Sequence, residues 1–267
     1  MTEEYVHGYS QREAQRLVDQ ATTLSDLLHF DTHYAERSTV LEVGCGIGAQ
    51  TIPLARNSPD AKITSMDISA GSIEKAKGRI EREGIRNVEF MVADIFDLPF
   101  EDGSFDHIFM CFVLEHLRDP MDALKHLRRV LRDGGTITII EGDHGSAYFH
   151  PESKEAAKAI DCLVRLQEMA GGDPKIGRRL FPLMTGAGFD HVEVSPRMVY
   201  VDDSKPALVE GFTKLTFTAM VEGVEREALS EGLMPRDEWR KGIADLYRTA
   251  EAGGTFCYTF FKGVGRK

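Results

Sequence analysis

The run Val40-Leu-Glu-Val-Gly44-Cys-Gly46-Ile-Gly48, followed by Ala49-Gln50-Thr51, decides the fold of this chain. Its first half is typical of a buried strand, and this strand ends on three closely spaced glycines. Glycine tolerates positive φ and places no Cβ between the backbone and a ligand, so a nucleotide-like molecule can lie against main-chain N–H groups. The alternative is an ordinary glycine-rich turn from a strand into a helix.

Two aspartates close the next two expected strands. Asp67 ends the segment 62–67, and Asp94 ends the segment 88–94. A carboxylate about 20 residues past the glycines lies at the tip of the second parallel strand, where it can accept hydrogen bonds from both ribose hydroxyls. Asp94 is expected one strand further out, where it can accept from the exocyclic amine of adenine. Either aspartate alone is more typical of a helix N-cap or a turn, but the ordered series favours nucleotide binding.

The glycine spacing fits two cofactor classes. It can be read as Gly44-x-Gly46-x-Gly48 or as Gly44-x-Gly46-x-x-Ala49, and the second is the pattern of dinucleotide-binding folds. Glu42 completes the pattern Glu-x-Gly-x-Gly-x-Gly, which resembles motif I of the class I S-adenosylmethionine-dependent methyltransferases.

Two further segments carry the same resemblance. The segment 105–117 resembles the fourth strand of that family with its following loop, and the segment 129–136 resembles the turn into its fifth strand. The resemblance covers about residues 38 to 145 and is closest to the ubiquinone/menaquinone-methyltransferase-like, small-molecule branch. It implies that the chain binds S-adenosylmethionine and methylates a small molecule; the alternatives are an NAD-dependent oxidoreductase and a non-catalytic cofactor-binding protein.

The resemblance also implies where the cofactor contacts lie. They come from the glycine loop, from the ends of the neighbouring strands, and from an aromatic segment where this family closes a lid over its cofactor. The residues are Tyr9, Glu42, Gly44, Cys45, Gly46, Asp67, Ile68, Ala93, Asp94, Ile95 and Cys111. The aromatic face of Tyr9 can stabilise a sulfonium cation.

The chain alternates expected strands and helices at the spacing of βαβ units, which predicts a mainly parallel α/β sheet covered on both faces. The expected strands are 39–43, 62–67, 88–92, 105–111 and 135–141, and the expected helices are 12–30, 49–57, 70–83, 120–132, 151–169 and 178–187. By resemblance, 189–195 and the antiparallel 254–262 complete a Rossmann-like, doubly wound, seven-stranded sheet. We expect one domain: an N-terminal helical lid (1–37), a cofactor-binding core (38–145) and a remainder (146–267) with a helical insertion at 203–252.

Catalytic candidates follow from the chemistry of the cofactor. A sulfonium methyl is an activated electrophile, so transfer chiefly needs a nucleophile held in line, and a base only if the acceptor carries a proton. His116 after the fourth strand, and Glu141, Asp143 and His144 after the fifth, qualify by position. A turn cap is the alternative for His116.

The insertion offers apolar and aromatic side chains that suit an acceptor pocket, together with the stretch 150–174. These side chains are Phe212, Leu215, Phe217, Met220, Met234 and Trp239. The alternatives are that they complete the core or form a homodimer interface.

Composition limits the partners. The net charge of −11 and pI near 5.3 disfavour nucleic-acid substrates, because phosphate backbones repel an acidic protein. No apolar run approaches the roughly 18 residues of a membrane span, and the first residues lack the positive region of a signal peptide, so we expect a cytoplasmic protein. Four widely spaced cysteines indicate reduced thiols. His29 and His33 lack the glutamate of a zinc motif, so no metal is expected.

Overall fold

Strand β1 (Thr39–Val43), which precedes the glycines, lies between β2 (Lys62–Asp67) and β4 (Phe105–Cys111) and runs parallel to both. The structure is a computed structural model that describes residues 11–267. Strand β3 (Val88–Val92) adds to β2, and β5 (Leu131–Gly142) adds to β4, again in parallel. The final strand β8 (Thr255–Arg266) is antiparallel to β5, from Thr136 opposite Arg266 to Gly142 opposite Phe260.

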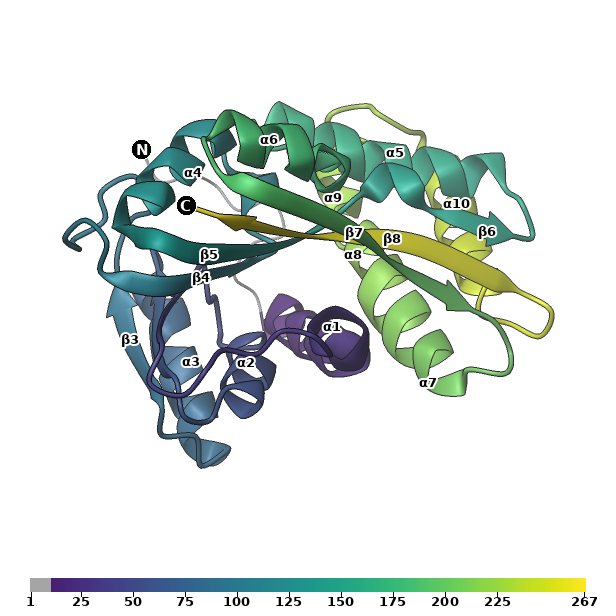
Figure 1. Cartoon of the computed structure of the whole chain (residues 1–267). Helices are drawn as coiled ribbons and strands as arrows, with labels where there is room; N and C mark the ends of the chain where they lie inside the picture. The colour runs from purple at the N-terminus through teal and green to yellow at the C-terminus, as the bar shows by residue number, and fades with distance from the viewer. Residues whose placement is uncertain (1–10) are drawn as a thin grey trace. The chain divides into compact units, whose positions relative to one another are not determined.

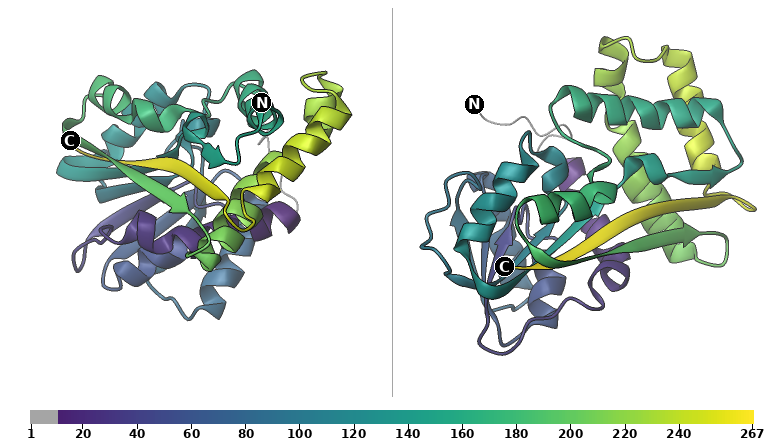
Figure 2. Two further views of the ribbon diagram at one scale, coloured as in Figure 1. Left: turned by 90° about the vertical axis from the view of Figure 1, so that its right-hand side faces the viewer. Right: turned by 45° about the horizontal axis from the view of Figure 1, so that its top comes forward.

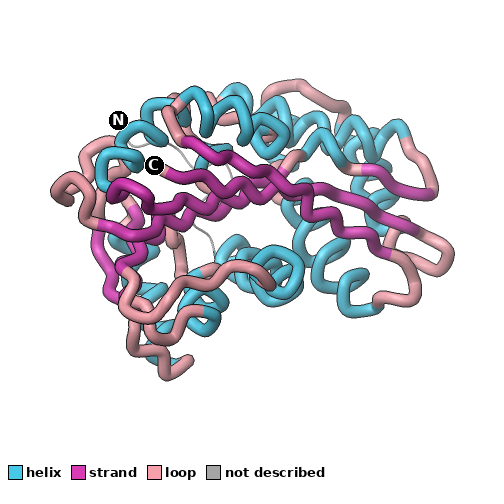
Figure 3. Tube along the Cα trace, viewed as in Figure 1, coloured by secondary structure: helices cyan, strands magenta, loops and turns pink. Residues whose placement is uncertain are grey.

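Strands β1 to β5 and the part of β8 from Phe260 onward belong to one of two compact units, here called the sheet unit (residues 25–142, 176–197 and 260–267). Helices cover both faces of its sheet, with α2 (Thr51–Asn57) and α3 (Ala70–Arg82) on one face, and α4 (Pro120–Val130) and α6 (Leu180–Gly186) on the other (Figures 1 and 3). The apolar side chains of α4 and α6 pack with Leu41, Val43 and Ile139 of the strands into a continuous core. The central parallel strands β1 and β4 are largely buried, as expected when helices cover a sheet, whereas the edge strand β3 is partly exposed.

The helical unit comprises residues 11–24, 143–175 and 198–259. It holds the first part of α1 (Gln11–His29), α5 (Lys154–Met169), α7 (Pro206–Leu208), a π-helix (Val209–Thr218), α8 (Ala219–Glu222), α9 (Glu225–Ser230) and α10 (Arg236–Arg248). Short strand β6 (Tyr148–His150) pairs antiparallel with the first residues of β8. Strand β7 (Asp190–Val201) also pairs with β8, and both views of Figure 2 show the two strands side by side.

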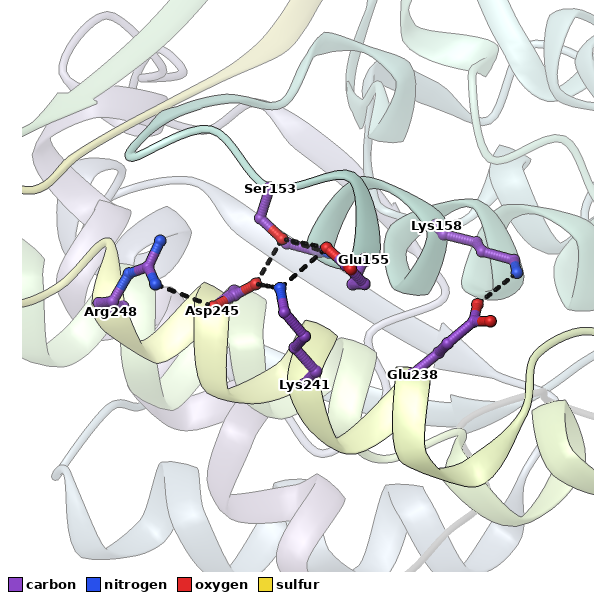
Figure 4. Close-up of polar contacts among 8 residues, drawn as sticks. Ser153, Glu155, Lys158, Glu238, Lys241, Asp245 and Arg248 are labelled. Carbon is purple, nitrogen blue, oxygen red and sulfur yellow. Dashed lines mark hydrogen bonds and ion pairs between the residues drawn. The ribbon is translucent and has the colours of Figure 1, made fainter.

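Helices α5 and α10 pack closely within the helical unit. Lys241 of α10 places its Nζ 2.9 Å from a carboxylate oxygen of Glu155 in α5 and 2.7 Å from one of Asp245 (Figure 4). The Ser153 hydroxyl donates to Asp245 over 2.5 Å. These polar contacts flank the place where Gly242 lets the two backbones approach.

The predicted α/β fold, mainly parallel with an antiparallel last strand, is confirmed. The described residues contain eight strands instead of the seven expected, because β6 is only three residues long and leaves no alternation pattern to detect. The expected helix 178–187 begins as a 3₁₀ turn at Ile176–Arg179, and β5 begins four residues early, at Leu131. The division into lid, core and remainder stays a prediction.

Candidate functional site

The glycine loop after β1 is tied to the end of β2 by two backbone amides. The Cys45 N–H donates to the Met66 carbonyl over 2.9 Å, and the Gly46 N–H donates to Asp67 Oδ2 over 2.8 Å. All three loop glycines have positive φ, between 51° and 77°. Asp67 therefore lies against the glycine loop, and its contact with a ribose stays a prediction.

The three glycines differ in their surroundings. A Cβ on Gly44 would lie 2.4 Å from Cγ2 of Val113, and one on Gly48 would lie 3.1 Å from the Cβ of Ala76. No atom of the protein lies within 4 Å of the place where a Cβ on Gly46 would stand. Gly44 and Gly48 thus permit close packing, whereas the place of a Cβ on Gly46, whose N–H donates to Asp67, is open.

Asp67 connects three strand ends. Its Oδ1 accepts from the Ser69 N–H over 2.9 Å, and its carbonyl accepts from the Ala93 N–H at the end of β3 over 3.1 Å. Burial raises the pKa of this carboxyl, and the amide donors of Ser69 and Gly46 partly offset that effect. Each carboxylate oxygen accepts one protein hydrogen bond and keeps further acceptor capacity for hydroxyl donors.

The residues beyond β2 and β3 surround the same strand ends. Ile68 follows Asp67 with 59% of its surface exposed, although it is apolar. Asp94 Oδ1 accepts from the Phe96 N–H over 2.9 Å, and the neighbouring Ile95 is buried. Asp94 therefore caps a turn, as its single-residue interpretation predicted, but its position beside Ala93 also agrees with the nucleotide interpretation.

Glu42 is the fourth residue of β1 and precedes the glycine loop by two positions. Its side chain is buried, and its carboxylate accepts from the Ser65 hydroxyl of β2 over 2.5 Å. Burial raises its pKa to about 7. Cys45 and Cys111 are buried as well, and burial raises the pKa of both thiols. These three side chains belong to the interior of the sheet unit.

Two of the catalytic candidates belong to this unit. His116 ends the 3₁₀ turn Leu114–His116, is partly exposed, and places Nε2 3.6 Å from Glu115 Oε1. Glu141 is fully buried, and its Oε1 accepts from the N–H groups of Val113 and Leu114 over 3.0 and 2.7 Å. The Glu141 carboxylate is therefore engaged by backbone amides of the loop after β4.

The other two candidates, Asp143 and His144, belong to the helical unit. His144 is buried, and its Nδ1 lies 2.7 Å from the Tyr258 hydroxyl. Asp143 accepts from the Gly145 N–H over 2.9 Å. Within this unit the His144 ring also contacts the edge of Phe217, with ring centroids 6.4 Å apart.

Most of the apolar side chains predicted for an acceptor pocket are buried within the helical unit. Phe212 and Phe217 form one aromatic cluster with Phe256 and Tyr258, with centroids 4.7 to 6.4 Å apart. Met220, Met234 and Trp239 are also buried, whereas Leu215 is 42% exposed.

Tyr9 lies outside the described residues. His29 Nε2 donates to Gln50 Oε1 over 2.7 Å, and burial lowers the pKa of His29 to about 4. Among residues 11–267 no group of three or more His, Cys, Asp or Glu side chains is placed to hold a metal ion. Within the same range no helix has the length and apolarity to cross a membrane.

Phe112 and Val113 shape the loop after β4 and are not among the predicted site residues. Phe112 has φ of 59°, which is unusual for a bulky residue, and Val113 packs onto Gly44. No local pattern indicates either property. The sequence signal nearest to this loop is an acidic residue, Glu141, close to the end of the apolar strand β5.

A family model and a curated relative that match this chain are both described as methyltransferases. The family model described as "Methyltransferase domain" matches residues 41–139. The demethylmenaquinone methyltransferase of Geobacillus stearothermophilus is 32% identical over 171 residues, which cover 58% of this chain and 72% of that protein. The chain spans about half the length of several other curated relatives, 52%, 48% and 47% of three of them.

Solved structures share the fold at low identity. The phosphoethanolamine N-methyltransferase 2 of Haemonchus contortus in complex with S-adenosyl-L-methionine has a TM-score of 0.56 at 16% identity, and the match covers 93% of this chain and 52% of that one. The [4+2]-cyclase SpnF has a TM-score of 0.56 at 18% identity, with coverages of 93% and 80%.

Proposed function

The chain belongs to the class I S-adenosylmethionine-dependent methyltransferases, and we propose that it transfers the methyl group of S-adenosylmethionine to a small-molecule acceptor, leaving S-adenosylhomocysteine. The observation that carries this proposal is the open space at Gly46, the residue whose N–H donates to the carboxylate of Asp67. Bound S-adenosylmethionine supplies an activated methyl group, so the protein's task is chiefly to position the two reactants.

The residues around that space fit the parts of a nucleoside. Asp67 would accept hydrogen bonds from the ribose hydroxyls, and the exposed apolar surface of Ile68 would face the adenine ring. Asp94 would accept from the adenine amine, at the strand end next to Asp67. Glu42, bound to Ser65, would hold the loop. For an acceptor that carries a proton, the partly exposed His116 is the candidate base within the sheet unit.

The acidic net charge of −11 supports a small acceptor over a nucleic acid. An NAD-dependent oxidoreductase is not favoured, because the matched relatives are named methyltransferases. The similarity to a [4+2]-cyclase shows that this fold also serves other chemistry, so turnover must be measured and not only cofactor binding.

A matched pair of glycine variants tests the cofactor site. Gly46 and Gly84 both have positive φ, and neither has an atom near the place of a Cβ, but Gly84 lies in the turn after α3. Ala at either position is expected to cost about 1 kcal/mol of stability, because both turns need positive φ. Only Gly46→Ala should also weaken S-adenosylhomocysteine binding, by tenfold or more in calorimetry. Equal affinity in the two folded variants would contradict the proposed site.

A second pair tests the ribose contact. Asp67→Ala should weaken cofactor binding by about tenfold to a hundredfold, because it removes a charge-assisted acceptor worth roughly 1.5 to 3 kcal/mol. Asp60→Ala, an exposed aspartate before the start of β2, is the control and should bind normally. Labelled S-adenosylmethionine and NAD, offered in parallel, distinguish the two cofactor classes. Methyl transfer to any acceptor would exclude a non-catalytic role.

A further inference from the structure

We propose that Glu141 is a positioning residue: through the amides of Val113 and Leu114 it holds the loop after β4 against the glycine loop. This inference rests on the proposed function for its effect on transfer, but its structural part can be tested without turnover. It assigns Glu141 a different role from that of a general base.

The first step is the engagement of the carboxylate. Glu141 ends β5 with no exposed surface, and its Oε1 accepts from two consecutive amides over 3.0 and 2.7 Å. Its Oε2 is buried and has no hydrogen-bond partner among the described residues. Burial and the neighbouring Glu115 raise the pKa of Glu141 well above its ordinary value, and the backbone amides that it accepts from partly offset that effect.

The second step is the strained turn that these amides follow. The Phe112 N–H donates to the Ile140 carbonyl over 2.9 Å, which continues the ladder between β4 and β5. Phe112 then adopts φ of 59°, a conformation that a bulky residue keeps only when its surroundings enforce it. Glu141 anchors the two residues that come next, and the Phe112 ring packs against Phe260 with centroids 5.5 Å apart. The turn is thus fixed on both sides.

The third step connects the turn to the cofactor site. The Val113 side chain fills the space beside Gly44, where a Cβ would lie 2.4 Å from its Cγ2. Gly44 begins the loop whose next glycine, Gly46, donates to Asp67. A continuous set of contacts therefore runs from Glu141 through Val113 to the loop that would hold the cofactor.

Three variants test this role. Glu141→Leu removes the acceptor at similar volume, and we expect hydrogen exchange of the Val113 and Leu114 amides to accelerate by tenfold or more, with S-adenosylhomocysteine affinity falling by about tenfold. Glu141→Gln keeps an acceptor oxygen, and should restore exchange and affinity to within about threefold of the wild type. Val113→Ala keeps the amides and removes the contact with Gly44, so it should weaken binding without accelerating their exchange.

Kinetics separate positioning from proton transfer. For a positioning residue, Glu141→Gln should retain kcat within about fivefold and leave the pH profile of kcat unchanged. For a general base, the same variant should lose kcat by ~10² to 10⁴ while binding the cofactor normally. That result would overturn the proposal, as would unchanged amide exchange in Glu141→Leu. If that variant does not fold, Glu141→Gln and Val113→Ala still decide. Absence of any transferase activity would refute the proposed function, while amide exchange and cofactor affinity would still report on Glu141.

Discussion

At the scale of single residues, the loop after β1 divides its tasks among similar side chains. No larger residue fits at positions 44 and 48 without displacing Val113 or Ala76, whereas the place of a Cβ on Gly46 is open. The two acids of this region, Glu42 and Asp67, also differ in their hydrogen-bond partners. Glu42 is buried and bonded to Ser65, while Asp67 joins the amides of Gly46 and Ser69 at the end of β2. One motif thus combines glycines that pack against neighbouring side chains with residues for which we propose ligand contacts.

Glu42 predicts a pH dependence of stability. Burial raises its pKa from 4.5 to about 7, so between these values the native state keeps a proton that the unfolded chain has lost. The free energy of unfolding should therefore fall as pH rises through this window, by up to about 3 kcal/mol in total. Glu42→Gln cannot titrate, so its stability relative to the wild type should increase from pH 4.5 to pH 8.

Urea unfolding at a series of pH values measures that difference, since groups common to both proteins cancel. Glu89→Gln, at an exposed position on β3, is the control and should show no such trend. A difference between wild type and Glu42→Gln that does not change with pH would show that Glu42 is ionised in the native state across the window.

At the scale of elements, close approach of α5 and α10 organises the helical unit. A Cβ on Gly242 would lie 2.5 Å from the Glu155 carbonyl oxygen and 3.3 Å from the Cβ of Ala159. The ion pairs of Lys241 lie beside this contact, and water screens the charge of the exposed Lys241 ammonium. Backbone proximity at Gly242, more than these charges, sets how the two helices pack.

Alanine at two helical glycines should therefore have opposite effects. Gly242→Ala is expected to destabilise the protein by about 1 to 3 kcal/mol, because the added methyl overpacks the helix contact. Gly78→Ala, in α3 with no atom within 4 Å of the added Cβ, should stabilise it by up to about 1 kcal/mol through helix propensity. Urea midpoints compare the two variants with the wild type. Changes of the same sign would contradict the packing role of Gly242.

At the scale of the whole molecule, the cofactor motif and the aromatic insertion belong to different compact units. The glycine loop, Asp67 and Asp94 belong to the sheet unit, and the aromatic residues of the insertion belong to the helical unit. The motif that resembles other methyltransferases is thus confined to one unit. We propose that the other supplies contacts to the acceptor.

Exchange of residues 203–252 for the same segment of a relative with a different acceptor tests this division. Acceptor preference should change, because Phe212, Phe217 and the π-helix come with the segment, while S-adenosylhomocysteine affinity should stay within about threefold. Competition assays with both acceptors measure the preference, and calorimetry measures the affinity. A folded chimera that keeps its original acceptor would show that recognition lies outside the segment.

The sequence by itself determined the parallel strands, the glycine loop and its aspartate. Strand periodicity and the spacing between Gly46 and Asp67 are local properties of a βαβ unit, and the hydrogen bond between these residues follows from that unit's geometry. The short strand β6 and the π-helix leave no such signal, because three residues show no alternation and a π-helix differs from an α-helix only in its hydrogen bonds.

Only the tertiary structure decided what the polar side chains near the strand ends do. Position at the carboxyl end of the fifth expected strand favoured Glu141 as a base, yet its carboxylate accepts from amides 27 and 28 residues away, and His144 contacts Tyr258 across 114 residues. Burial and hydrogen-bond partners govern the charge and reach of a titratable group. Both come from segments that are distant in sequence and meet only when the sheet and helices have packed, so residue type and spacing cannot specify them.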